Sequence, residues 1–273
     1  MLMACGESQE ERQLRRARDL RDAPYPIQTH ADCAPGSRRG AAGFGDARYT
    51  TQHLRYTLVT PRNYDAARAH PLLVVFAPAK ISRHEVERVT GFTAPSTAAG
   101  FIVVYADHVA LGSETTRALG EIAADVAATW CVDESRIFHA GHSDGGTVSH
   151  MLAVMPDTSR QIAGIAPSGA GVRASDLEVY GCPQPRAVMV SHGAEDKQFP
   201  GWGAETARWW ARCNRCSTVS VRDAQGCQAF QGCAPGAPTR FCEIPGGHAR
   251  WPGNAEAVVA FFRDLPAGTA TKQ

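Results

Sequence analysis

Short apolar runs alternate along the chain with segments that have helical spacing. Residues 71–77 and 100–106 are almost continuously apolar, which is typical of strands buried on both faces. Residues 55–60 instead alternate between polar and apolar side chains, and this pattern predicts a half-buried antiparallel strand. The other predicted strands are 136–142, 162–166, 186–192 and 241–244. The chain is therefore expected to form a sheet whose central strands are fully covered.

Helical patterns lie between these strands. Apolar residues recur at Ile122, Val126 and Trp130, and they predict a helix over 114–130. Further helices are predicted at 146–155, 206–212 and 255–265. Because strands and helices alternate, the predicted fold class is α/β, with a mostly parallel central sheet and helices on both of its faces.

The two ends of the chain differ from this regular part. Residues 1–47 are polar, rich in Arg, Gly, Ala and Pro, and without steady periodicity, so we expect a tail and loops there. The basic stretch 12–21 predicts a short solvated helix or a disordered arm. Residues 48–266 are expected to form a single domain, followed by a disordered tail over 267–273.

Composition and charge fit this picture and exclude some partners. The 273 residues are 44% hydrophobic and 20% charged, as expected for one large domain with a sizeable core. A net charge of +1 gives no reason to expect nucleic acid or an anionic surface as a partner. No apolar run approaches the ~20 residues that are needed to span a bilayer.

The chain has nine cysteines, five of them between residues 213 and 242. This number favours disulfides formed in an oxidising compartment. Two alternatives remain for the spacing Cys213-x-x-Cys216, namely a zinc site and a redox motif, although no second C-x-x-C follows. Eight cysteines would make four bridges, whose pairing the sequence leaves open. They are Cys33, Cys131, Cys182, Cys213, Cys216, Cys227, Cys233 and Cys242.

Cys5 is the odd cysteine. Residues 2–6 match the end of a bacterial lipoprotein signal, in which the cysteine is lipidated, but no charged and apolar leader precedes them. Either the natural chain starts further upstream, or the match is chance. The first option predicts a lipid anchor at Cys5. With the disulfides, the predicted location is secreted or in the cell envelope, that is periplasmic, with a lipid anchor under the first option.

The segment Gly141-His142-Ser143-Asp144-Gly145 carries the candidate chemistry. It is a G-x-S-x-G nucleophile elbow, preceded by a predicted strand and followed by a predicted helix. In such a turn the serine hydroxyl lies at the top of the sheet, and glycines on either side relieve crowding. The pattern indicates a reactive serine at position 143.

A serine nucleophile needs a general base, and the base needs a carboxylate that fixes its tautomer. In elbow enzymes the chain order is serine, acid, histidine. His248 lies in a Gly-rich loop after the last predicted strand, and we expect it to be the base. His192 is expected to be a satisfied histidine beside the site. Asp196 is the predicted acid, with its neighbour Glu195 as the rival.

Four motifs in order resemble one family. They are residues 71–76, residues 131–146, His192-Gly-x-x-Asp-x-x-x-Pro200 and Gly247-His248 with Trp251-Pro-Gly253. The chain is similar over 56–262 to the secreted polyhydroxybutyrate depolymerase, feruloyl esterase and acetylxylan esterase family. The resemblance implies an α/β-hydrolase fold, and it places the family's acid and base on Asp196 and His248.

Two departures from the family pattern stand out. The family usually has His-Gly after its third strand, where a backbone N–H helps to form the oxyanion hole, whereas this chain has Ala77-Pro78-Ala79-Lys80. Because Pro78 has no N–H, we expect the donors to be the N–H groups of Ala79 and Asp144. One additional residue also separates His248 from Trp251.

Three side chains are candidates for lining the substrate site: Lys80, His142 and Trp251. Lys80 either favours an anionic substrate or is simply exposed to solvent. Trp251 either lines the acyl site or packs under the His248 loop.

The predicted function is hydrolysis of carboxylic esters through Ser143, His248 and Asp196, with an acyl-enzyme and without a cofactor or metal. Polyester, feruloyl and acetyl-sugar esters are the candidate substrates, small or polymeric. The alternatives are a serine peptidase on the same fold, and a binding protein that has the fold but weak or no turnover. The oligomeric state stays open.

Overall fold

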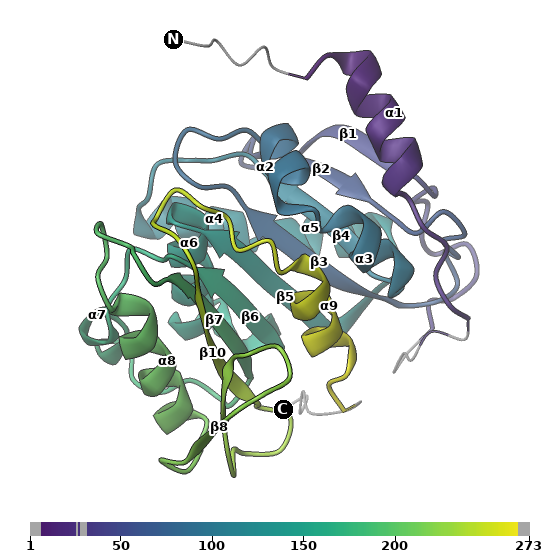
Figure 1. The fold of residues 1–273 in the computed structure, drawn as a ribbon. Coiled ribbons are helices and arrows are strands. Elements are labelled where there is room, and N and C mark those ends of the chain that lie inside the picture. Colours follow the sequence, from purple (N-terminus) through teal and green to yellow (C-terminus); the bar gives the residue numbers. More distant parts are fainter. Residues whose placement is uncertain (1–6, 26, 28–31, 267–273) are drawn as a thin grey trace, which may run out of the picture.

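A single twisted sheet organises the molecule (Figure 1). The computed structural model describes residues 7–25, 27 and 32–266. Within them, ten strands pair in the order β1-β2-β4-β3-β5-β6-β7-β10-β9-β8. The strands are β1 (Phe44–Tyr49), β2 (Arg55–Val59), β3 (His70–Phe76), β4 (Ile102–Ala106), β5 (Val132–His142), β6 (Gly164–Ser168), β7 (Ala187–Gly193), β8 (Ser220–Arg222), β9 (Gln228–Phe230) and β10 (Thr239–Ile244). The six strands from β4 to β10 in this order pair in parallel, and the flanking strands pair antiparallel.

Helices cover both faces of this sheet, so the predicted α/β class is confirmed (Figure 1). The helices are α1 (Gln9–Asp19), α2 (Arg83–Thr90), α3 (Thr93–Ala98), α4 (Ser113–Gly120), α5 (Ile122–Thr129), α6 (Asp144–Val154), α7 (Ala174–Glu178), α8 (Trp202–Cys213) and α9 (Ala255–Arg263), with the short 3₁₀ turn η1 (Ser159–Gln161). One buried cluster joins the sheet to α2, α9 and Phe92 just before α3, and the other joins it to α4, α5, α6 and α8. Burial of these apolar faces is the main stabilising contribution to the fold.

The predicted helix over 114–130 is in fact two helices, α4 and α5. The break follows Gly120, where an added Cβ would lie 2.9 Å from a methyl carbon of Leu152. The glycine therefore lets α4 approach α6 closely, and this contact bends the path of the chain. Helices α2, α3 and α7 and the short strands β8 and β9 were not predicted, because they are too short to show a clear period.

The segment before the first strand is more ordered than predicted. The expectation that residues 1–47 form only a tail and loops is wrong for the described residues, which include α1 and most of β1. Ser8 caps α1, and its side chain and that of Glu11 exchange hydrogen bonds with each other's backbone N–H groups. Arg16 is only 3% exposed and binds both carboxylate oxygens of Glu87 in α2. Of the two alternatives predicted for residues 12–21, the short helix is confirmed, but a buried ion pair joins it to the domain.

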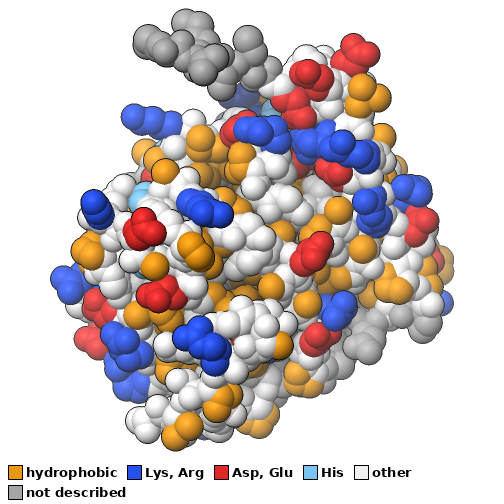
Figure 2. All heavy atoms as spheres, in the orientation of Figure 1, with side chains coloured by type: hydrophobic (Ala, Val, Ile, Leu, Met, Phe, Trp, Pro, Cys, Tyr) orange, Lys and Arg blue, Asp and Glu red, His pale blue; other side chains and the backbone are white. Residues whose placement is uncertain are grey.

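Charged side chains of both signs are interspersed on the surface. Figure 2 shows Lys and Arg next to Asp and Glu across one face, as expected for a chain with a net charge of +1. No helix in the described part of the chain is long and apolar enough to cross a membrane.

Four disulfides pair the eight cysteines, as the cysteine count predicted. The bonds are Cys33–Cys131, Cys182–Cys213, Cys216–Cys233 and Cys227–Cys242. Cys213 and Cys216 bind different partners, so the zinc and redox alternatives for this spacing are wrong. Cys5 lies outside the described residues.

Two disulfides of very different span should differ in their effect on stability. Cys33–Cys131 closes a loop with a sequence separation of 98, against 17 for Cys216–Cys233. A longer loop removes more entropy from the unfolded chain, and the difference corresponds to about 1.5 kcal/mol. We expect Cys33→Ser/Cys131→Ser to lower the free energy of unfolding by that much more than Cys216→Ser/Cys233→Ser. Denaturant titration of both variants measures it, and equal losses would contradict the expectation.

Candidate active site

Ser143 lies in a strained turn between β5 and α6. Its φ of +53° and ψ of −117° place it in a region that residues other than glycine rarely adopt. The backbone packs so tightly that a Cβ on Gly145 would lie 2.1 Å from the Phe76 carbonyl oxygen, and one on Gly141 would lie 2.4 Å from Gly145. Only glycine fits at these two positions, and this explains the G-x-S-x-G spacing.

The structure brings the three predicted catalytic side chains together at the carboxyl edge of the parallel strands. Ser143 Oγ lies 2.9 Å from His248 Nε2, and His248 Nδ1 lies 2.9 Å from Asp196 Oδ2. Ser143 follows β5, Asp196 follows β7 and His248 follows β10. When His248 is neutral and donates from Nδ1 to the carboxylate, its Nε2 accepts the serine hydroxyl.

Asp196 is held as a carboxylate. It is 5% exposed, and burial alone would raise its pKa. Hydrogen bonds outweigh this effect, since Oδ1 accepts from the Phe199 and Gln198 N–H groups and Oδ2 accepts from His248. The pKa of Asp196 therefore lies below its ordinary value. The group is a charged acceptor that orients the imidazole.

The rival residues of the sequence analysis lie outside this chain of hydrogen bonds. Glu195 is exposed and turned to solvent, whereas the adjacent Asp196 is buried. His192 is buried, with Nε2 donating to the Phe199 carbonyl at 2.9 Å. Burial lowers the pKa of His192, so it remains neutral and supports the loop that carries Asp196.

The prediction that His142 lines the substrate site is wrong, because its side chain is buried and both of its ring nitrogens form hydrogen bonds within the protein. Nε2 lies 2.7 Å from the backbone oxygen of His248, and Nδ1 lies 3.0 Å from Ser168 Oγ. A carbonyl oxygen only accepts, so Nε2 of His142 carries the proton, and its Nδ1 accepts a hydrogen bond from the Ser168 hydroxyl. His142 thus holds the backbone of His248 in place.

The loop after β3 lies beside the elbow, as the contact between Gly145 and the end of β3 shows. In the described chain, the N–H groups of Ala79 and Asp144 donate to no protein acceptor, and Asp144 begins α6. A helix start leaves its first N–H groups free for an anion. Lys80 is exposed, with a φ of +65°, in a turn closed by the Ile81 N–H and the Pro78 carbonyl.

Sequence reasoning missed a second histidine near the elbow. His108, in the loop after β4, lies with Nε2 3.0 Å from Asp144 Oδ2. Its backbone N–H points to the Ile81 carbonyl, and Asp107 binds the backbone and side chain of Arg83. The β4 loop therefore ties the loop after β3 to the start of α6. No motif marks His108, because its role depends on a contact 36 positions away.

Aromatic side chains surround His248. Trp251 is half-buried and packs edge-on against Phe92, with its ring centre 5.5 Å from that of His142. Phe199 approaches His248 edge-on at 5.0 Å and stacks on Trp202 at 4.8 Å. Phe199 and Trp202 were not predicted, although Phe199 lies inside the Asp196 motif. These half-exposed rings form a flat apolar surface beside the His248 imidazole.

Comparisons with known proteins agree with the motifs. A probable feruloyl esterase C from Aspergillus terreus is 29% identical over 147 residues, which are 50% of this chain and 51% of that protein. The match thus spans about half the length of that curated relative. No protein-family model matches the chain.

Solved structures give the fold. An acetyl xylan esterase from Aspergillus awamori has a TM-score of 0.63 at 15% identity, covering 82% of this chain and 99% of that one. An S-formylglutathione hydrolase from Staphylococcus aureus has a TM-score of 0.62 at 14% identity, covering 82% and 99%. The α/β-hydrolase fold is confirmed, and so is the resemblance to feruloyl and acetylxylan esterases.

His142 predicts how stability depends on pH. Burial lowers its pKa to about 4, against 6.5 in an exposed histidine. The unfolded chain therefore binds this proton first, and the contribution to stability is complete above pH 6.5 and lost as the pH falls toward 4. Between pH 7 and 5 the wild type should lose about 2 kcal/mol more unfolding free energy than His142→Gln. Urea titrations at both pH values measure this difference, and parallel pH profiles would refute it.

Proposed function

We propose that this protein is a serine esterase that hydrolyses carboxylic esters through an acyl-enzyme. The hydrogen-bonded chain Ser143–His248–Asp196, with 2.9 Å at both links, is the observation that carries the proposal. This is the geometry that an elbow serine needs to be activated by a neutral imidazole. The similarity to esterases in sequence and fold supports the same reaction class.

In the first half of the reaction, Ser143 Oγ attacks the ester carbonyl carbon while His248 Nε2 takes the hydroxyl proton. Asp196 stabilises the resulting imidazolium, which keeps its Nδ1–H on the carboxylate. The imidazolium then protonates the leaving alcohol, and the acyl group stays on Ser143. Water enters, gives its proton to His248 and releases the acid by the same steps in reverse.

The oxyanion of each tetrahedral intermediate needs preorganised donors. We assign this role to the N–H groups of Asp144 and Ala79. The first belongs to the residue after the nucleophile and begins α6, whose dipole favours negative charge. The second lies in the loop that His108 and Asp107 tie to the elbow. Ala79 would thereby replace the donor that the family's His-Gly supplies.

The candidate substrates are those of the resembling proteins, namely feruloyl, acetyl-sugar and polyester compounds. The rings of Phe199 and Trp202 stack beside His248 and offer a flat apolar surface. This surface favours an ester with a planar or apolar group over a small polar one. A screen of acetyl, feruloyl and hydroxybutyrate esters, compared by kcat/KM, orders these classes.

An oxidising compartment fits the four disulfides, and we place the protein outside the cytosol. Lipid anchoring at Cys5 stays a prediction. The competing function is a binding protein without turnover, since Ala77–Lys80 departs from the family pattern. Hydrolysis that depends on Ser143, and covalent labelling of that serine, distinguish an esterase from a binding protein.

Ser143→Ala should abolish hydrolysis of p-nitrophenyl acetate. Removing the nucleophile of a triad lowers kcat by about 10⁴-fold or more. Wild type should also react with a fluorophosphonate probe, and Ser143→Ala should not. Glu195→Gln is the control, because this exposed carboxylate lies next to Asp196 but outside the triad. Wild-type protein that neither turns over the ester nor labels would favour the binding protein.

The second test concerns Ala79. Ala79→Pro removes the proposed N–H donor, and the loss of one oxyanion donor costs on the order of 10²–10³-fold in kcat. Ala79→Gly keeps the N–H and should stay near wild type. Steady-state kinetics should show the loss in kcat with little change in KM. If folded Ala79→Pro kept full activity, the Ala79 N–H would not be the second oxyanion donor.

A further inference from the structure

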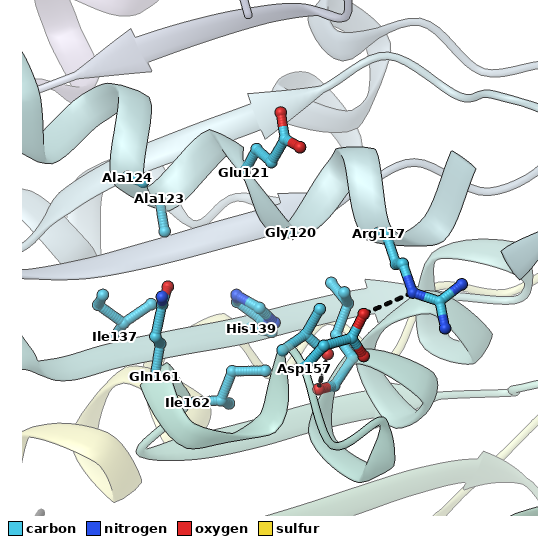
Figure 3. Close-up of a pocket in the computed structure, with 12 residues that line it drawn as sticks. Arg117, Gly120, Glu121, Ala123, Ala124, Ile137, His139, Asp157, Gln161 and Ile162 are labelled. Atoms are coloured by element: carbon cyan, nitrogen blue, oxygen red, sulfur yellow. Dashed lines mark hydrogen bonds and ion pairs between the residues drawn. The ribbon is translucent and has the colours of Figure 1, made fainter. Parts of the chain in front are cut away.

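A cavity of about 260 Å³ lies on the face of the sheet that α4, α5 and α6 cover (Figure 3). Its apolar wall includes Ala123, Ile137, Leu152 and Ile162. These side chains come from α5, β5, α6 and the turn before β6, so four elements build the space. The imidazole of His139 stands in the middle of this wall (Figure 3).

This cavity is separate from the catalytic site. None of Ser143, Asp196 and His248 lines it. His139 lies in β5, and Ser143 follows four positions later in the turn after that strand; at a strand rise of ~3.3 Å per residue the two are up to ~13 Å apart. The cavity is therefore not an extension of the ester site.

One nitrogen of the His139 imidazole is buried without a protein hydrogen-bond partner. His139 is 2% exposed, and Nδ1 forms no hydrogen bond within the described chain. Burial, together with the nearby Arg186 charge, lowers its pKa to about 3, so the ring is neutral. A neutral imidazole presents one N–H donor and one nitrogen acceptor. Buried polar groups are normally paired, and this ring instead lines an accessible space.

The mouth of the cavity is polar and carries one positive and two negative side chains. Arg117 and Asp157 form an ion pair there, drawn in Figure 3. Glu121 accepts a hydrogen bond from Gln52, and Gln161 adds an uncharged amide. Arg117 is the only cation among the described residues that line the mouth, and Asp157 pairs with it, so these residues offer no free positive charge to a carboxylate or phosphate. It fits an uncharged molecule.

We propose that this cavity binds a small uncharged alcohol or phenol, with its hydroxyl group on the His139 imidazole and its apolar body against Ile137, Leu152 and Ile162. A hydroxyl group both donates and accepts, and so it matches the imidazole in either tautomer. The volume suits a single ring or a short chain, since it is at the lower end of ligand pockets. The site is independent of ester hydrolysis.

Phenol and benzene are the matched probes, because they differ by the hydroxyl group alone. Calorimetric titration of the intact, disulfide-bonded protein should give about tenfold tighter binding of phenol, the gain expected from one buried hydrogen bond. A crystal structure with phenol should show its oxygen within hydrogen-bond distance of a His139 ring nitrogen. Both measurements use wild-type protein.

His139→Phe is the variant test. Phenylalanine keeps the edge-on packing against Phe76, whose ring centre lies 5.1 Å from that of His139, but removes the polar nitrogens. The variant should bind phenol no better than benzene, keep its ester hydrolysis, and melt at or above the wild-type temperature because an unpaired buried polar group is lost.

Three results would overturn the proposal. Equal affinity of wild type for phenol and benzene would make the cavity a plain apolar void. No binding of either would leave it a water-filled space. Phenol found elsewhere in the crystal would remove His139 from its recognition. Because these readouts do not involve Ser143, they are independent of the esterase proposal.

Discussion

The close approach of two backbone segments determines the geometry of the site. Gly145 lies against the Phe76 carbonyl at the end of β3, with no room for a Cβ. This contact presses the start of α6 against the sheet edge and holds Ser143 at its positive φ. It also brings the loop 77–80 beside the Asp144 N–H. The nucleophile and both proposed oxyanion donors are therefore placed by one steric constraint.

A second layer of hydrogen bonds fixes the remaining groups around this turn. His142 is the neighbour of Ser143 in sequence, yet it holds the backbone of His248, 106 positions away. His192 holds the Phe199 carbonyl, and the Phe199 N–H in turn binds Asp196. Burial lowers the pKa of both supporting histidines, so each is neutral and donates one N–H, His142 to the His248 carbonyl and His192 to the Phe199 carbonyl. The proposed base His248 and the proposed acid Asp196 are thus oriented by two histidines that lie outside the proposed triad.

Local patterns made the elbow turn, the central strands and the convergence of Ser143, Asp196 and His248 predictable. Each of these depends on a short motif or on a continuous apolar run. The docking of α1 was not predicted, because its basic pattern resembles a solvated helix and its partner Glu87 lies 71 positions from Arg16. The capping box at Ser8 and Glu11 was a usable signal for the helix itself. Disulfide pairing, and the contact of His108 with Asp144, likewise depend on distances that no sequence spacing shows.

Two features of β5 and its turn reduce stability, namely the backbone of Ser143 and the unpaired imidazole of His139. The strained backbone of Ser143 and the buried side chain of His139 persist because the packed neighbouring strands leave no room for another conformation. The sheet clamps the turn from β3 and β6, and Ser143 N–H is bound to the Ser168 carbonyl at 2.9 Å. Four disulfides lower the conformational entropy of the unfolded chain and so stabilise the folded protein. The disulfides therefore add stability at positions away from Ser143 and His139.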